Sequence, residues 1–311
     1  MEDKGDYSFS TCWNIKQQQS GRRLIEEIKE LGFRHVELNY NVTRELLSSI
    51  EPMIDSGEIS ISSVHNVFPY VSDKDYDTDS LLLGYKDESK RRRAVELLIT
   101  SVEYARRYGA KAVVVHPGEV PFDYNIDHEL KQLYQEYGPG SPEYQRLWRQ
   151  MADVREQHSP AYCERIRGSL EEVSEYVAKK GWQVTIGIET RSRCYQIPTL
   201  SEAKAICDSL KGSPVRLWYD IGHATMMDRM GLYSNTEELD DLLPYIYGVH
   251  IHETLGLSDH WCPYVHSNDP QSFDFYLKAI EAATLKVYEL KAACSAEDIQ
   301  RSHRLITGKL H

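Results

Sequence analysis

The residues in this sequence that could do chemistry together are histidines and acids that each end a short apolar run. A typical case is His116, which directly follows Val113-Val114-Val115. Imidazole and carboxylate groups together suit Zn²⁺, Mn²⁺, Co²⁺ or Fe²⁺ better than Mg²⁺ or Ca²⁺, which prefer shells made only of oxygen. The pattern therefore indicates a divalent metal site. Its six candidate members are His65, His116, Glu189, Asp220, His250 and Glu289.

The elements that must position these residues follow from an alternation along the chain. Short β-branched runs alternate with amphipathic helical patterns, which is typical of βαβ units and a parallel sheet. Helical patterns cover 22–31, 91–108, 199–210 and 295–306, the second with Ser89 as its expected cap. Left-handed glycines are expected after helices at Gly32, Gly109 and Gly181. The eight strand-like runs begin near Tyr7, His35, Ile59, Lys111, Val184, Val215, Ile246 and Leu285.

Eight strand–helix units average about 39 residues each, which favours a single α/β domain over residues 1–311, a closed (β/α)₈ TIM barrel. The alternative is an open doubly wound sheet, but the sequence has no G-x-G-x-x-G after the first run and no G-x-x-x-x-G-K. Residues 119–161 are polar and too long for an ordinary connection. They predict a helical insertion after strand 4 that forms a lid over the barrel mouth.

The strand ends of such a barrel meet at one mouth. Glu189, Asp220, His250 and Glu289 would end the adjacent strands 5 to 8, so they could hold one ion and leave positions open for a substrate. His223 follows Asp220 by three residues. It is expected either to approach the substrate or a second ion, or simply to begin a helix.

Composition narrows the class of protein. The chain of 311 residues is 41% hydrophobic, and 36 basic against 48 acidic residues give 36 − 48 = −12, which disfavours nucleic acid as a partner. No apolar run approaches the roughly 18–20 residues that span a bilayer, and the start lacks a signal pattern. The six scattered cysteines form no C-x-x-C pair. They indicate reduced thiols and a cytoplasmic protein without membrane contact.

The order and spacing of the strand-end motifs resemble the xylose isomerase-like (β/α)₈ barrels over roughly 36–291. That superfamily includes sugar phosphate isomerases and epimerases, ketose 3-epimerases, inosose-processing enzymes and apurinic endonucleases of the endonuclease IV type. The motifs that carry the resemblance are His116-Pro117-Gly118, Ile188-Glu189-Thr190, Asp220-Ile221-Gly222-His223, Val249-His250-Ile251-His252-Glu253 and Glu289-Leu290-Lys291.

The resemblance implies roles for these residues. Glu189, Asp220, His250 and Glu289 match the metal quartet of the sugar-converting members. Glu189 and Glu289 match their opposed pair of bases, with His223 as a further catalytic residue. The additional ligands of the three-metal endonuclease branch are matched by His65, His116, His223 and His260.

One position departs from the endonuclease pattern. In that branch an aspartate lies two residues before the histidine matched by His260. Here Ser258 takes that place and Asp259 comes one residue late. The third metal is therefore in question.

The function expected from these residues is a metal-dependent isomerase or epimerase of a sugar, sugar phosphate or polyol-derived ketone. It would act by carboxylate-mediated proton transfer through a metal-stabilised enediolate, with Zn²⁺, Mn²⁺ or Co²⁺ as the cofactor. The alternatives are an endonuclease IV-like multi-zinc phosphodiester hydrolase and a metal-binding accessory barrel. A homo-oligomer would be ordinary for this fold. The expected substrate-binding residues are His65, His116, Arg191, His252 and Lys291.

Overall fold

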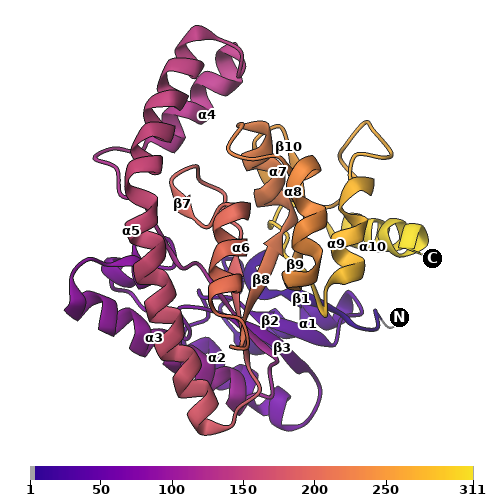
Figure 1. Cartoon of the computed structure of the whole chain (residues 1–311). Helices are drawn as coiled ribbons and strands as arrows, with labels where there is room; N and C mark the ends of the chain where they lie inside the picture. Colours follow the sequence, from indigo (N-terminus) through magenta and orange to yellow (C-terminus); the bar gives the residue numbers. More distant parts are fainter. Residues whose placement is uncertain (1–3, 311) are drawn as a thin grey trace.

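A computed structural model describes residues 4–310 and shows a closed barrel of eight parallel strands, in which β1 pairs with β12 to complete the ring (Figure 1). Each strand begins within one residue of its expected start, so the predicted (β/α)₈ fold is confirmed. The barrel strands are β1 (Tyr7–Ser10), β2 (His35–Leu38), β3 (Ser60–His65), β4 (Ala112–Val115), β6 (Thr185–Glu189), β8 (Val215–Asp220), β9 (Ile246–Ile251) and β12 (Leu285–Tyr288).

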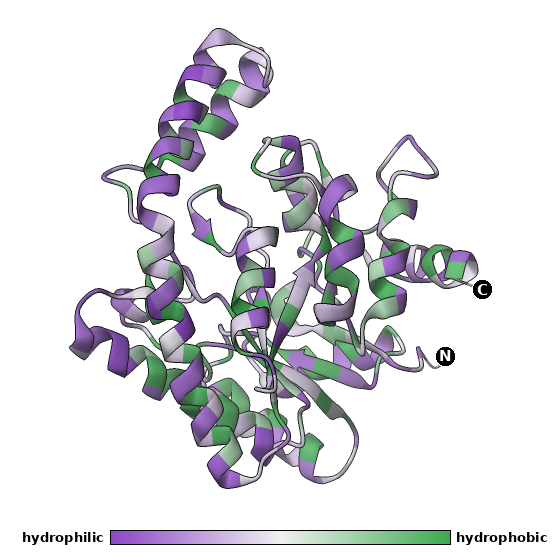
Figure 2. Ribbon diagram, viewed as in Figure 1, coloured by the Kyte–Doolittle hydropathy of each residue, from purple (hydrophilic) through white to green (hydrophobic). Residues whose placement is uncertain are grey.

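Helices surround the barrel, and Figure 2 shows that hydrophobic residues concentrate along the strands and on the helix faces that cover them. The surrounding helices are α1 (Gly21–Glu30), α2 (Arg44–Asp55), α3 (Glu88–Arg107), α6 (Leu200–Ser209), α7 (Ile221–Arg229), α8 (Asn235–Leu242), α9 (Leu277–Ala282) and α10 (Ala296–Leu310). Short 3-10 turns lie at Thr11–Trp13, Lys74–Tyr76, Leu82–Gly84, Leu243–Tyr245 and Asp274–Tyr276. No helix in the described range 4–310 is long and apolar enough to cross a membrane.

The ends of the helices agree with the sequence analysis except at one cap. Gly32, Gly109 and Gly181 have φ values of 95°, 71° and 66°, as expected for left-handed residues after helices. The prediction that Ser89 caps this helix is wrong, because α3 begins one residue before Ser89. The carboxylate of Asp87 accepts hydrogen bonds from the amides of Ser89 and Lys90 instead.

The insertion after strand 4 contains α4 (Ile126–Tyr137) and the first part of α5 (Pro142–Lys180). Because α5 is continuous to residue 180, one helix both extends the insertion and covers the barrel. Figure 1 shows α4 rising beyond the hairpins at the mouth. Tyr144 donates a hydrogen bond to the carbonyl of Met230, which ties the insertion to the end of α7. Its action as a lid stays a prediction, as does the single-domain boundary.

The barrel interior is filled on one side by Trp218, which is fully buried. Gly248 lies beside it on the paired strand β9, and Gly187 lies on β6. A Cβ atom at Gly187 would lie 2.9 Å from the indole, and one at Gly248 would lie 2.3 Å from it. These two glycines therefore provide the space that the indole needs.

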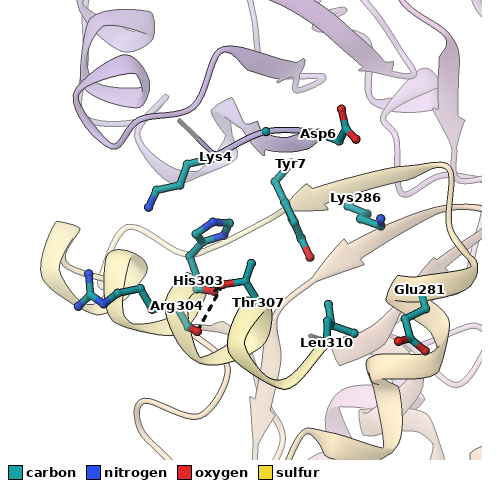
Figure 3. Close-up of a pocket in the computed structure, with 10 residues that line it drawn as sticks. Lys4, Asp6, Tyr7, Glu281, Lys286, His303, Arg304, Thr307 and Leu310 are labelled. Carbon is teal, nitrogen blue, oxygen red and sulfur yellow. Dashed lines mark hydrogen bonds between the residues drawn. The ribbon is translucent and has the colours of Figure 1, made fainter. Parts of the chain in front are cut away.

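A cavity of about 650 Å³ opens at the opposite end of the barrel from the strand-end histidines and acids. Figure 3 shows that Tyr7 and Lys286, at the starts of β1 and β12, line this cavity together with His303 of α10. Active sites of such barrels lie at the C-terminal ends of the strands. This cavity is therefore not the candidate site.

Arg155 fastens α5 to the loop after β6 and to α6. Its guanidinium donates to the carbonyls of Cys194 (2.9 Å) and Gln196 (2.5 Å) and forms two hydrogen bonds of 2.9 Å with Glu202. Its side chain is only 6% exposed. A buried guanidinium needs an anion for its charge and acceptors for its N–H groups. Glu202 supplies the anion, and the two carbonyls supply the further acceptors.

Replacing Arg155 by Ala should lower the free energy of unfolding by about 3–5 kcal/mol, because Glu202 and two carbonyls lose their buried partner. Urea denaturation measures the change. The matched control is Arg167→Ala on the same helix, where exposed ion pairs with Glu164 and Glu171 should contribute almost nothing. Equal losses in the two variants would contradict this account of the junction.

Candidate functional site

The six residues singled out from the sequence lie together at the C-terminal mouth of the barrel. His65, Glu189 and Asp220 are the last residues of β3, β6 and β8, and His116 and Glu289 directly follow β4 and β12. All six side chains are buried. The ligand atoms of Glu189, Asp220, His250 and Glu289 lie within 4.8 Å of one another, so these four could hold one ion.

His250 is at the centre of this group. Its Nδ1 lies 2.9 Å from Glu189 Oε1, 3.2 Å from Glu289 Oε2 and 3.5 Å from Asp220 Oδ2. Its Nε2 faces the carboxylate of Glu37 at 3.1 and 3.2 Å. A carboxylate on the far nitrogen fixes the ring and directs Nδ1 toward a ligand position, as is usual around metal-binding histidines.

Glu37 was missed by the sequence analysis. It is fully buried on β2 and also accepts a hydrogen bond of 2.8 Å from Ser63 Oγ. The available signal was an acid in the apolar run Val36-Glu37-Leu38, because an ionised side chain in a buried strand requires a partner.

The ionisable groups of this site differ in the direction of their pKa shifts. Burial opposes ionisation of Glu189, but the imidazoles of His116 and His250 hold its pKa well below the usual value. Burial raises the pKa of Glu289, and the negative charges of Glu189 and Glu37 add to that effect. Burial would also lower the pKa of His250, but the surrounding carboxylates raise it well above 6.5. The site therefore favours a positive charge at its centre and holds one carboxyl that takes up a proton readily.

A second group adjoins the first through Glu189. His65 Nε2 lies 3.2 Å and His116 Nε2 lies 2.5 Å from Glu189 Oε2. Both rings use Nδ1 as a donor, His65 to the carbonyl of Asn66 and His116 to the carboxylate of Asp79 at 3.1 Å. Asp79, which the sequence analysis did not single out, thus orients His116.

Arg191 places a permanent positive charge beside this second group. Its side chain is 3% exposed, with Nη1 3.3 Å from Glu189 Oε2 and Nη2 2.6 Å from Asp79 Oδ1. Its Nε is buried and has no hydrogen-bond partner in the described structure. Arg191 therefore adds positive charge at the oxygen that His65 and His116 also approach, and it leaves one donor for a further ligand.

A third group lies on the other side of Asp220. His223 Nδ1 donates to the carbonyl of Thr190 (3.2 Å), and His260 Nδ1 donates to the carbonyl of Glu289 (2.8 Å). Because a carbonyl can only accept, Nδ1 of each ring carries a proton, and Nε2 is the nitrogen that faces away from the carbonyl. Burial lowers the pKa of His223 to about 4, so this ring is neutral near pH 7.

Asp259 reaches this third group despite its displacement by one residue. Its Oδ2 lies 3.9 Å from His223 Nε2. Successive residues of a strand point to opposite faces, so Asp259 and His260 would normally diverge. His260 has φ of 60° on β11 (Ser258–Trp261), which pairs with β10 (Glu253–Leu255), and this left-handed backbone breaks the alternation. An aspartate directly before the histidine can therefore stand near His223.

His252 contacts Asp220, and its ring lies in a group with His223 and His260 whose ligand atoms are within 4.8 Å of one another. The backbone amide of His260 donates a hydrogen bond to His252 Nδ1 at 2.9 Å. The proton of the His252 ring is therefore on Nε2, which lies 2.8 Å from Asp220 Oδ1 and donates to it. Both ring nitrogens therefore have partners in the structure, and the substrate contact expected of His252 from the sequence stays a prediction. The ring packs against Gly222, where a Cβ atom would lie 2.1 Å from it. This close approach explains the glycine of the Asp220-Ile221-Gly222-His223 motif.

Lys291 lies at the rim of the mouth. Its amine is 4.3 Å from the centre of the Trp261 ring and donates to Ser258 Oγ at 2.9 Å. The structure therefore places Lys291 beside the β10–β11 hairpin, whereas Arg191 lies within the buried site.

Glu119 contributes a buried carboxyl to the same end of the barrel. It lies on β5 (Gly118–Glu119), which pairs with β7 (Gln196–Ile197), and its Oε2 is buried without a hydrogen-bond partner in the described structure. Burial raises its pKa to about 7, although Arg193 acts in the opposite direction.

The raised pKa of Glu119 predicts a pH-dependent stability. The folded state holds the Glu119 proton more tightly than the unfolded state, so the contribution of Glu119 to stability is fully present below about pH 4.5 and is lost as the pH rises toward about 7. Relative to wild type, Glu119→Gln should gain about 2 kcal/mol in unfolding free energy between about pH 5.5 and about pH 8. Urea titrations at the two pH values measure this. Glu119→Leu should show the same dependence, and parallel curves for wild type and both variants would contradict it.

Comparisons with known proteins agree with the barrel fold. A family model described as xylose isomerase-like TIM barrel matches residues 25–306. No curated protein matches the chain by sequence. Among solved structures, 3-keto-D-glucoside 4-epimerase from E. coli is 16% identical, with a TM-score of 0.66 over 97% of this chain and 99% of that one.

Two further structures show the range of this fold. A D-tagatose 3-epimerase-like protein is 18% identical, with a TM-score of 0.64 over 98% of this chain and 97% of that one. Endonuclease IV from Thermus thermophilus is 13% identical, with a TM-score of 0.57 over 98% of this chain and 97% of that one. At these identities the likeness shows a shared fold.

Proposed function

Because the chain belongs to the xylose isomerase-like TIM barrel family, we propose that it is a metal-dependent isomerase or epimerase of a sugar, sugar phosphate or polyol-derived ketone. The observation that carries the proposal is the buried group of Glu189, Asp220, His250 and Glu289, with ligand atoms within 4.8 Å of one another. The likeness in fold to several epimerases of keto sugars supports a carbohydrate substrate.

The donor set fits a divalent ion such as Zn²⁺, Mn²⁺ or Co²⁺. Three carboxylates face His250 Nδ1, and Glu37 can hold the proton of this ring on Nε2, which leaves Nδ1 as a ligand. When bound, the ion would supply a Lewis acid that stabilises negative charge on a substrate oxygen.

The chain's own carboxyl groups would move the proton. Isomerisation or epimerisation removes a proton beside a carbonyl and returns it to the neighbouring carbon or the opposite face. Glu289, whose pKa is raised by burial and like charge, is suited to exchange a proton, while Glu189 stays ionised beside Arg191. His223 Nε2 would accept a hydrogen bond from a substrate hydroxyl.

The remaining side chains at the mouth would bind or position. Arg191 has a free Nε–H for a substrate oxygen, and His65 and His116 lie at the same face of Glu189. His252 would position Asp220. Lys291, beside Trp261 at the rim, would meet the outer part of a longer or acidic substrate.

A multi-metal phosphodiester hydrolase is the second candidate function. The groups His65–His116–Glu189 and His223–His252–His260 adjoin the central quartet, as a three-metal site would require, and Asp259 lies 3.9 Å from His223 in the second of them. Against it, the Arg191 guanidinium lies 3.3 Å from Glu189 Oε2, where a second divalent ion would meet a fixed positive charge. The net charge of −12 also disfavours a polyanionic substrate.

Solvent deuterium exchange tests the proposal. Wild-type protein with added Mn²⁺, Co²⁺ or Zn²⁺ should introduce deuterium beside the carbonyl of at least one ketose, detected by NMR. The panel holds free and phosphorylated ketoses, including D-tagatose, D-allulose and L-ribulose. Glu289→Gln should slow the exchange by about 10²–10⁴-fold because it removes the base. A chelator should abolish exchange, and returning the metal should restore it.

The control for this experiment is Glu281→Gln, the same substitution at an exposed residue at the other end of the barrel. Its exchange rate should equal that of wild type. If Glu289→Gln exchanges as fast as wild type, the assignment of Glu289 as the base is wrong. If no ketose exchanges and the protein cleaves abasic DNA with added zinc, the hydrolase replaces the isomerase.

A further inference from the structure

A second set of metal-ligating side chains lies apart from the strand-end site. The ligand atoms of Cys262, His266 and Cys294 lie within 4.8 Å of one another. Cys262 directly follows β11, and Cys294 lies in the loop between β12 and α10. Both cysteines are buried, whereas His266 is exposed on its loop. The three residues come from two chain segments that meet at the rim of the mouth.

A carboxylate stands beside this cluster. Asp298, in the first turn of α10, has its Oδ2 4.0 Å from His266 Nε2. Ser295 Oγ donates to the same carboxylate oxygen at 2.7 Å, which holds the aspartate in place. The cluster offers two sulfurs and one imidazole nitrogen, and the carboxylate beside His266 could supply the fourth ligand that a tetrahedral ion takes.

We propose that Cys262, Cys294, His266 and Asp298 bind a structural Zn²⁺ ion, separate from the strand-end site. Two thiolates with an imidazole select Zn²⁺ over harder divalent ions. In a tetrahedral site with Zn–S bonds of about 2.3 Å, two sulfurs lie about 3.8 Å apart. Because the ligand atoms of Cys262, His266 and Cys294 lie within 4.8 Å of one another, these three need to close by at most about 1 Å. His266, on its exposed loop, is the ligand best placed to make that movement.

The position of this cluster gives the ion a structural task. Cys294 Sγ is 3.5 Å from the carbonyl of His260, and the amide of Lys291 donates to the same carbonyl at 2.9 Å. An ion here would join the segment that carries Asp259 and His260 to the segment that carries Glu289. It would thereby fix the left-handed turn at His260.

Cobalt substitution tests the site, because the strand-end ligands contain no sulfur. Metal-depleted, reduced full-length protein is titrated with Co²⁺, and thiolate-to-cobalt charge-transfer absorption is recorded. The absorption should saturate with one equivalent of thiolate-bound cobalt and disappear when Zn²⁺ is added. Cys262→Ser should abolish it. His266→Ala, which alters only an exposed loop residue, should weaken cobalt binding at least about tenfold.

Cys12→Ser is the matched control, because Cys12 lies at the mouth near Glu289 yet outside the cluster, and it should keep the absorption. If Cys262→Ser does not fold, His266→Ala decides the question. A folded wild-type protein without thiolate-to-cobalt absorption would overturn the proposal. A disulfide between Cys262 and Cys294 in freshly isolated protein would overturn it equally. Neither result depends on whether ketose exchange is observed.

Discussion

The structure depends on the burial of four carboxylates at one end of a parallel barrel. Glu37, Glu189, Asp220 and Glu289 all lie below the protein surface around a single imidazole, His250. Burying a charge is costly unless it is paired, so this end of the barrel requires positive charge. Protonated histidine and Arg191 supply part of it in the structure described, and a divalent ion would satisfy the requirement more completely.

Much of the surrounding chain serves to hold these charges in place. Gly222 allows His252 to pack behind Asp220, and Gly187 and Gly248 make room for Trp218 beneath the site. The left-handed backbone at His260 turns Asp259 toward His223. The three glycines act by leaving space for a neighbouring ring, and the left-handed residue acts by changing the direction of the chain.

The sequence predicted the features that depend on local hydrophobic patterns, namely the strands and the helices of the barrel. The alternation of apolar runs and amphipathic helices located all eight strands, and barrel geometry then required their ends to meet. It did not reveal contacts between distant residues: Glu37 and Asp79 orient His250 and His116 across the barrel mouth. The pattern of strand ends also did not show that both ring nitrogens of His252 have partners, the His260 amide and Asp220. Asp259 was judged displaced because a left-handed residue at a non-glycine position cannot be read from spacing.

The central claim is that the buried carboxylates and His250 enclose one divalent ion. Anomalous X-ray diffraction from crystals grown with Mn²⁺, recorded above and below the manganese edge, tests it directly. The account predicts one strong peak about 2.0–2.2 Å from ligand atoms of Glu189, Asp220, His250 and Glu289. Peaks only elsewhere, with His250 Nδ1 still hydrogen-bonded to Glu189, would contradict it.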